Sequence, residues 1–340
     1  MFLVLYVHAD FLSLGAPDAA RFAAAPLDAS ASVLAQSLAV VCVNVFVMIS
    51  GWFGIRPKVR SAASLLFQIF FLIFLINCVA WLAGLGRPGI MEWADCFLLT
   101  KGYWFPKAYL MLYLAAPALN ALVEHTSRWQ LRVLLILFFL FQTVYGCIFS
   151  SAAWFAGGYS PVSFAGLYLL MRYVRLYSPR YATLKARTDL QLYLGLALVN
   201  TGCVVLTGFL AQRMPLAEIL LAHAMGKITG YVNPLTIAAS LFLLLAFSKL
   251  RLQSKAVNWL AASAFAVFLL HGHRLIFGPV YAPVCQALHE AWGAAYFLLV
   301  IPILAGVYVA CVLVDQLRIF VWKRIEGPAD ELVRRLLRRL

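Results

Sequence analysis

Two histidines inside apolar runs are the residues best suited to acid–base chemistry. His8 lies in "LVLYVHADFL" near the start of the chain, and His271 lies in "AVFLLHGHRLIF" towards its end. Ionisable side chains are costly in hydrocarbon, so each is a candidate functional residue. An imidazole titrates near physiological pH and can act as a general base towards a hydroxyl group. A neutral histidine hydrogen-bonded between two helices explains the same positions equally well.

Other catalytic patterns are missing from the sequence. Asp10 is two residues after His8 and points to a different helical face, so we expect it to make a separate polar contact. The chain has no paired-carboxylate site, GxSxG turn, Walker loop or GxGxxG fingerprint. The histidines and the seven cysteines show no metal-ligand spacing, which argues against a metal site.

A second candidate site consists of cations at the ends of apolar runs. Arg172 and Arg175 are one turn apart in "GLYLLMRYVRLY", and Lys58 and Arg60 follow "VNVFVMISGWFGI". Guanidinium groups match phosphate geometry, so these four side chains are candidates to hold an anionic cytosolic ligand. The interfacial belt of basic and aromatic residues at span ends explains them as well.

A third set of candidates lies in "YWFPKAYLMLYLAAPALNAL". Tyr109 and Tyr113 are four residues apart on one helical face, Trp104 precedes them, and Asn120 follows. We take these four side chains as candidate substrate-binding residues.

Membrane-spanning helices must position all of these residues. The 340-residue chain is 64% hydrophobic and 12% charged, whereas soluble domains carry about 25% charged residues. Its apolar runs are continuous and about 20 residues long, which predicts transmembrane helices and argues against barrel strands. We predict an all-α, polytopic membrane protein with about ten transmembrane helices, at residues 1–14, 33–53, 61–85, 102–123, 131–151, 158–177, 189–210, 231–248, 256–275 and 292–320.

The basic residues predict the orientation of these helices. Twenty of the 27 Lys and Arg residues fall on one set of loops and the C-terminal tail, which predicts that both termini are cytoplasmic. The helices of His8 and His271 then both run outwards, so the two histidines are expected at comparable, outward-leaning depths. The net charge of +14 does not indicate nucleic-acid binding, because the cations flank apolar runs.

We divide the chain into a transmembrane domain, residues 1–322, and a basic tail, residues 323–340. Gly327-Pro328 is expected to break the last span. The tail "ELVRRLLRRL" separates leucines from arginines on opposite helical faces, which suits a helix on an anionic membrane surface. A tail that only sets the orientation is equally compatible with the pattern.

Six stretches, in order along the chain, resemble the acyltransferase 3 family of bacterial integral-membrane enzymes that acylate surface glycans. They are "VLYVHADF", "VNVFVMISGWF" followed by "KVRS", "YWFPKAYLMLYLAAPALNAL", "GGYSPVSFAGLYLLMRYVRLY", "YVNPLTIAASLFLLLAF" and "VNWLAASAFAVFLLHGH". The resemblance implies a cytosolic acyl-CoA co-substrate, often acetyl-CoA, and O-acylation of a glycan or glycolipid hydroxyl at the bacterial cytoplasmic membrane. It also implies that His8 is the catalytic histidine of the first span and that His271 is the second histidine.

The sequence departs from the family pattern at its start. The family places an arginine about ten residues before the first-span histidine, and here that position would precede Met1. The first span is also short, which favours an N-terminally truncated first helix. Two other hypotheses for the function remain. The protein could be a membrane transporter of an acyl group or small anion with histidine proton relays, or a catalytically inactive homologue.

Overall fold

The chain folds as a bundle of helices. The computed structural model describes residues 1–84, 86–227 and 229–337, and these ranges contain helices and connecting segments but no strand. The first half contains α1 (Phe2–Ala9), α2 (Phe11–Leu14), α3 (Ala19–Ala24), α4 (Pro26–Ala39), α5 (Cys42–Phe53), α6 (Val59–Leu82), α7 (Ile90–Asp95), α8 (Trp104–His125), α9 (Arg128–Phe141), η1 (Gln142–Ile148), η2 (Ala153–Gly158) and α10 (Pro161–Tyr177). The second half contains η3 (Arg180–Thr183), α11 (Ala186–Ala211), α12 (Pro215–Lys227), α13 (Pro234–Ser248), α14 (Lys255–Ala262), α15 (Ala264–His271), α16 (Arg274–Ile276), η4 (Phe277–Tyr281), α17 (Ala282–Trp292), η5 (Gly293–Ala295) and α18 (Tyr296–Leu337).

The helices are those of a multi-pass membrane protein. Within the described ranges, five helical stretches are long and apolar enough to cross a bilayer: Pro26–Phe53, Val59–Leu82, Arg128–Ile148, Ala186–Ala211 and Arg274–Pro328. Shorter apolar helices occupy Phe2–Leu14 and Pro234–Ser248. The all-helical prediction is therefore confirmed, and each of the ten predicted segments overlaps between one and three consecutive helices. The number of spans and the side on which the termini lie stay predictions.

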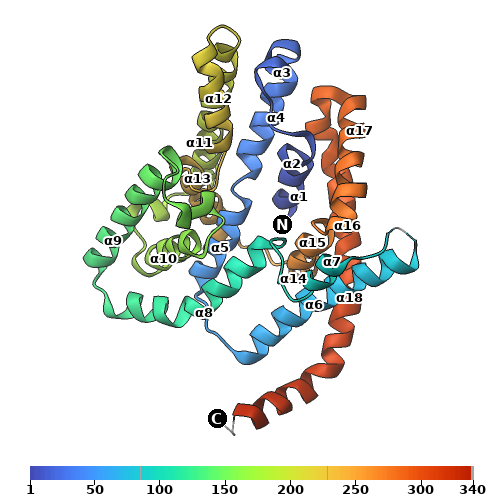
Figure 1. The fold of residues 1–340 in the computed structure, drawn as a ribbon. Helices are drawn as coiled ribbons and strands as arrows, with labels where there is room; N and C mark the ends of the chain where they lie inside the picture. The colour runs from blue at the N-terminus through green and yellow to red at the C-terminus, as the bar shows by residue number, and fades with distance from the viewer. Residues whose placement is uncertain (85, 228, 338–340) are drawn as a thin grey trace.

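Two hydrophobic cores organise the bundle, and α1 belongs to both. Val4 and Val7 of α1 pack into a core shared by α5, α8, α10 and α13. Leu5 and Ala9 of the same helix pack into a core shared by α6, α15, α17 and α18. Figure 1 shows the result: α1 lies in the middle of the molecule, between the α5–α13 group and the α15–α18 group. Side chains of α1 that belong to neither core therefore lie at the boundary of the two groups.

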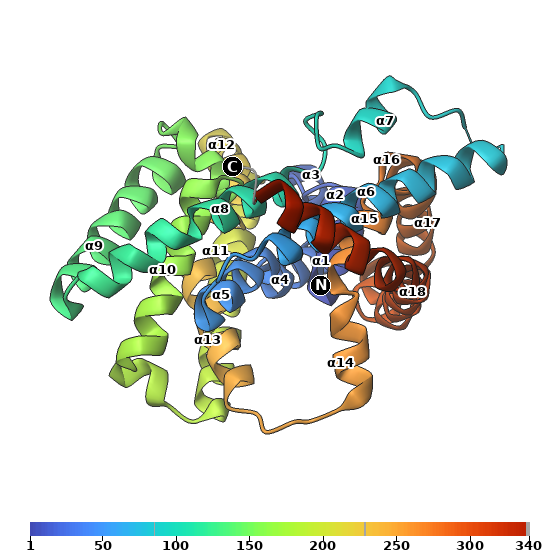
Figure 2. The ribbon, with the colours of Figure 1, turned by 90° about the horizontal axis from the view of Figure 1, so that it is seen from below.

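The last helix is longer than the sequence predicts. Pro302 and Pro328 both lie inside α18, which continues to Leu337, so the predicted break at Gly327-Pro328 is wrong. Proline removes one intrahelical hydrogen bond, yet the backbone stays helical on both sides. The end of α18 runs beneath the bundle in Figure 2, and Arg60 Nη2 lies 2.7 Å from Glu326 Oε2 there. Residues 338–340 of the predicted basic tail lie outside the described residues.

Candidate functional site

The two histidines singled out by the sequence are in direct contact. Nδ1 of His8, on α1, lies 2.9 Å from Nε2 of His271, the last residue of α15. Their ring centroids are 4.8 Å apart. The residues are 263 positions apart in the chain, and the prediction of comparable depth did not specify that they touch. His271 is 2% exposed, whereas His8 is partly exposed towards a cavity.

Backbone contacts set the proton arrangement of the pair. Nδ1 of His271 is hydrogen-bonded to the carbonyl oxygen of Val267, one turn earlier on the same helix. A carbonyl oxygen only accepts, so this nitrogen carries the proton, and Nε2 of the neutral ring must accept. His8 Nδ1 then donates to His271, which leaves His8 Nε2 as the nitrogen with a free lone pair. His271 thereby orients His8, as the third member of a catalytic triad orients its base.

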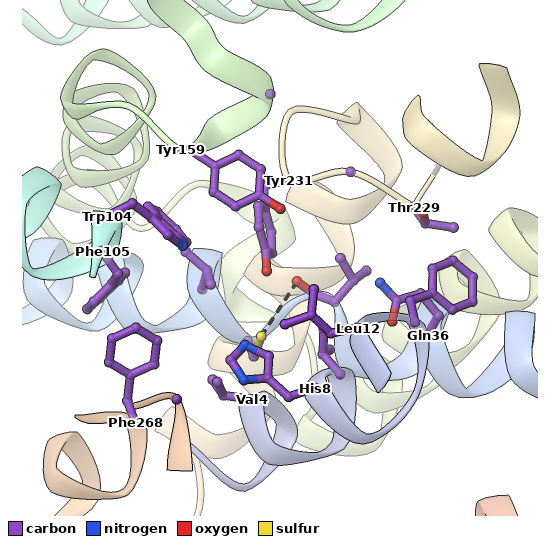
Figure 3. Close-up of a pocket in the computed structure, with 18 of the residues that line it drawn as sticks. Val4, His8, Leu12, Gln36, Trp104, Phe105, Tyr159, Thr229, Tyr231 and Phe268 are labelled. Carbon is purple, nitrogen blue, oxygen red and sulfur yellow. Dashed lines mark hydrogen bonds between the residues drawn. The ribbon is translucent and has the colours of Figure 1, made fainter. Parts of the chain in front are cut away.

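His8 lines a cavity of about 460 Å³ between the two helix groups. Ligand pockets in proteins commonly measure 300–1,000 Å³. Figure 3 shows the His8 ring with Trp104, Tyr159 and Tyr231 on one side of the space and with Gln36 and Thr229 at its other end. Tyr159 is 48% exposed and marks the mouth of the cavity.

Three aromatic rings from different elements form one wall of the cavity. Trp104 begins α8, Tyr159 precedes α10, and Tyr231 lies in the turn before α13. The Trp104 and Tyr159 centroids are 4.5 Å apart, and those of Tyr159 and Tyr231 are 5.1 Å apart, with both pairs edge-on. Asn44 Nδ2 donates to the carbonyl oxygen of Tyr231 at 3.0 Å and holds that turn in place.

Trp104 is the predicted substrate-binding residue that lies in the cavity. Of the other three, Tyr109 contacts α5, and Tyr113 and Asn120 contact the segment that joins α5 to α6. Tyr109 Oη is 3.0 Å from Ser50 Oγ, and Tyr113 Oη accepts from the Lys58 N–H at 2.8 Å. Asn120 Nδ2 donates to the Ile55 carbonyl oxygen at 2.8 Å.

The predicted anion-binding cations lie around the same α5–α6 segment. Gly54 has φ +75°, a conformation that glycine adopts without strain, and a Cβ there would lie 2.9 Å from Nη1 of Arg172. Nε of Arg172 is buried without a hydrogen-bond partner among the described residues. The Arg175 guanidinium lies over the Trp52 ring at 4.8 Å. The backbone of Lys58 is held by Tyr113, so Lys58, Arg172 and Arg175 lie near the C-terminal ends of α5 and α10. Arg60 lies on α6, and its guanidinium pairs with Glu326 of α18.

The cations and the cavity lie at opposite ends of these helices. Pro161 begins α10 next to the cavity mouth, and Arg172 lies about 16 Å further along that helix at 1.5 Å per residue. Between the two ends, Phe105 packs edge-on against Phe46 and Phe268, at centroid distances of 5.2 and 5.7 Å. These three rings also line the inner part of the cavity.

Asp10 makes a separate contact, as its spacing predicts. Ser32 Oγ donates to Asp10 Oδ1 at 2.7 Å, and Asp10 is 1% exposed. The sequence missed Gln36, Tyr159 and Tyr231. A single glutamine in an apolar helix and two tyrosines at span ends resemble ordinary membrane-protein features, so no local pattern marks them.

Comparison with known proteins places the chain among membrane acyltransferases. The acyltransferase domain family, Acyl_transf_3, matches residues 1–315, which include both histidines and every residue of the cavity. No match is found among curated proteins or among solved structures. Because the match covers nearly the whole bundle, the six stretches that resemble this family are parts of one domain, and the chain belongs to the acyltransferase 3 family.

Proposed function

We propose that the protein is a membrane O-acyltransferase that transfers an acyl group, acetyl in the simplest case, from cytosolic acyl-CoA to a hydroxyl of a glycan or glycolipid. The observation that carries the proposal is the His8–His271 pair, which presents a free imidazole nitrogen to a cavity. A histidine that only joined two helices would have both ring nitrogens engaged by protein groups.

The geometry supports direct transfer with His8 as general base. His8 Nε2 takes the proton of the acceptor hydroxyl as its oxygen attacks the thioester carbonyl carbon. The tetrahedral intermediate collapses, the C–S bond breaks, and the CoA sulfur takes the proton from His8. His271 stabilises the transient imidazolium by accepting the hydrogen bond from His8 Nδ1–H. The products are the acyl ester and free CoA.

The donor site in this proposal is the cationic end of the bundle. Arg172, Arg175, Lys58 and Arg60 would bind the phosphates of CoA at the cytoplasmic surface, with both termini on the same side and ten spans crossing the bacterial cytoplasmic membrane. The unpaired Nε of Arg172 supports this role, because a buried guanidinium nitrogen gains most from an added anionic acceptor. The thioester end would reach His8 past Phe46, Phe105 and Phe268.

The test is acetyl transfer by purified protein in lipid nanodiscs, with radiolabelled acetyl-CoA and the surface glycan of the host cell. His8→Gln keeps a polar side chain but cannot act as a base at neutral pH. We expect it to lower the turnover number by about 10²- to 10⁴-fold. The amount of folded protein recovered in nanodiscs should not change. His223→Gln is the matched control, because His223 is exposed on α12 outside the cavity.

Two results would contradict the proposal. Retention of acetyl transfer by His8→Gln would exclude His8 as the base. Movement of acetate or another small anion across proteoliposomes without acetyl-CoA turnover would favour the transporter reading.

A further inference from the structure

The cavity beside His8 is polar in places but carries no charged side chain. Among the described residues that line it, none is Lys, Arg, Asp or Glu. The nearest acidic residue along the chain, Asp10, is buried against Ser32 and is not part of the lining. A carboxylate or phosphate in this space would therefore lose its hydration and find no Lys or Arg side chain in the described lining to pair with, which is unfavourable.

The aromatic wall offers one kind of surface to a ligand. The rings of Trp104, Tyr159 and Tyr231 pack edge-on against one another and border the same space as His8 in Figure 3. A pyranose ring has an apolar face of axial C–H groups and a rim of hydroxyls. Such a face packs on aromatic rings by burial of apolar area, with no need for a charge.

Gln36 supplies the hydrogen-bonding group on the far side of the cavity. It lies on α4, is 6% exposed, and its Oε1 has no hydrogen-bond partner among the described residues. Figure 3 shows its carboxamide at the end of the cavity opposite Trp104. A buried amide oxygen without a partner is unfavourable. A ligand hydroxyl that reaches this oxygen would satisfy it.

We propose that this cavity binds one uncharged pyranose unit of the acceptor, with its apolar face on Trp104, Tyr159 and Tyr231 and with one hydroxyl donating to Gln36 Oε1. This inference rests on the proposed acyl transfer and narrows its acceptor to neutral hexose or N-acetylhexosamine units. Gln36 is a specificity-determining residue in this arrangement. It holds one hydroxyl so that a neighbouring hydroxyl faces His8 Nε2.

Matched pairs of small acceptors test whether the cavity prefers an uncharged sugar to an anionic one. Methyl β-D-glucopyranoside and methyl β-D-galactopyranoside are compared with their uronic acid counterparts, which differ by a carboxylate at C6. With purified protein in nanodiscs and radiolabelled acetyl-CoA, we expect kcat/KM to be at least 10-fold higher for the neutral member of the preferred pair. Equal transfer to both members of each pair would overturn the inference.

A pair of glutamine variants tests the role of Gln36. Gln36→Leu removes the amide and keeps an apolar side chain of similar size. We expect the KM for the neutral glycoside to rise roughly 3- to 10-fold, with the KM for acetyl-CoA unchanged. Gln142→Leu is the control: Gln142 is 1% exposed, its Oε1 also lacks a partner among the described residues, and it lies in η1 outside the cavity lining. Equal kinetics of the two variants would overturn the role of Gln36.

The inference and the proposed function fail in different ways. If neither neutral glycosides nor uronides are acetylated, while His8-dependent acetylation of the host glycan persists, the pyranose site is wrong and the transferase stands. If wild-type protein acetylates neither the glycosides nor the host glycan, both are wrong.

Discussion

Two buried polar pairs in the same bundle have opposite surroundings. Asp315 and Arg318 lie on α18 and are 0% and 7% exposed. Arg318 binds the carboxylate in a fork, with Nε–Oδ1 at 2.9 Å and Nη2–Oδ2 at 2.6 Å, and Gln68 of α6 approaches Oδ1 at 3.5 Å. His8 and His271 form one hydrogen bond between them, and one His8 nitrogen stays free at a cavity.

The difference separates a pair with a structural environment from the pair that we propose as reactive. The Asp315–Arg318 pair forms a two-bond fork within α18, is contacted by Gln68 of α6 and lines no described cavity, so its surroundings indicate a structural role. Ionisable residues in membrane spans are all functional candidates by position alone. The hydrogen bonds that each residue makes in the folded structure distinguish structural candidates from functional ones.

The largest effect on stability is expected for Asp315→Ala. It leaves the Arg318 guanidinium buried without its carboxylate, which costs about 3–5 kcal/mol. The free energy of unfolding, measured by denaturant titration in mixed micelles, should fall by that amount, and the yield of folded protein with it. Acetyl transfer per folded molecule should be unchanged.

The double variant Asp315→Leu with Arg318→Met sharpens this prediction. Replacing both partners by apolar side chains removes the unpaired charge, so most of the lost stability should return. A double variant as unstable as Asp315→Ala would show that the pair has a role beyond its own charges.

Apolar periodicity and flanking charge predict much of the fold. They place helices correctly because a hydrocarbon solvent forces every run of about 20 apolar residues to satisfy its backbone internally. The same signals miss α12 and the α16–α17 segment, whose residues are mixed in polarity. They also predict a helix break at Gly327-Pro328, where α18 continues.

The candidate site is predictable only in part. His8 and His271 stand out because titratable residues are rare in apolar runs, but their contact depends on how α1 and α15 pack. The pairing of Arg60 with Glu326 likewise cannot be predicted from local sequence patterns, because 266 positions separate the two residues. Gln36 becomes notable only when its neighbours in space are known, because no residue in the described part of the chain bonds its amide oxygen.

A smaller effect, on activity this time, is expected for His271→Ala. Loss of the acceptor for His8 Nδ1–H frees the His8 ring to rotate and to change tautomer, which should lower kcat by about 10- to 100-fold. KM for both substrates should change little. His271→Gln retains an acceptor oxygen and should recover part of the loss. A purely structural His271 would instead lower the amount of folded protein, with kcat per folded molecule unchanged.

The smallest effect is expected for Tyr168→Phe, in a third polar cluster that resembles the Asp315–Arg318 pair. Tyr168 Oη accepts from the Ile55 N–H at 3.0 Å and donates to Asn120 Oδ1 at 2.6 Å, so the cluster is satisfied internally. Removing the hydroxyl should lower the free energy of unfolding by about 1 kcal/mol and leave kcat unchanged. Asn120→Ala tests whether this cluster also binds substrate. If Asn120 contacts substrate, its variant raises a KM that Tyr168→Phe leaves unchanged. If Asn120 only supports the α5–α6 segment, the two variants have the same kinetics.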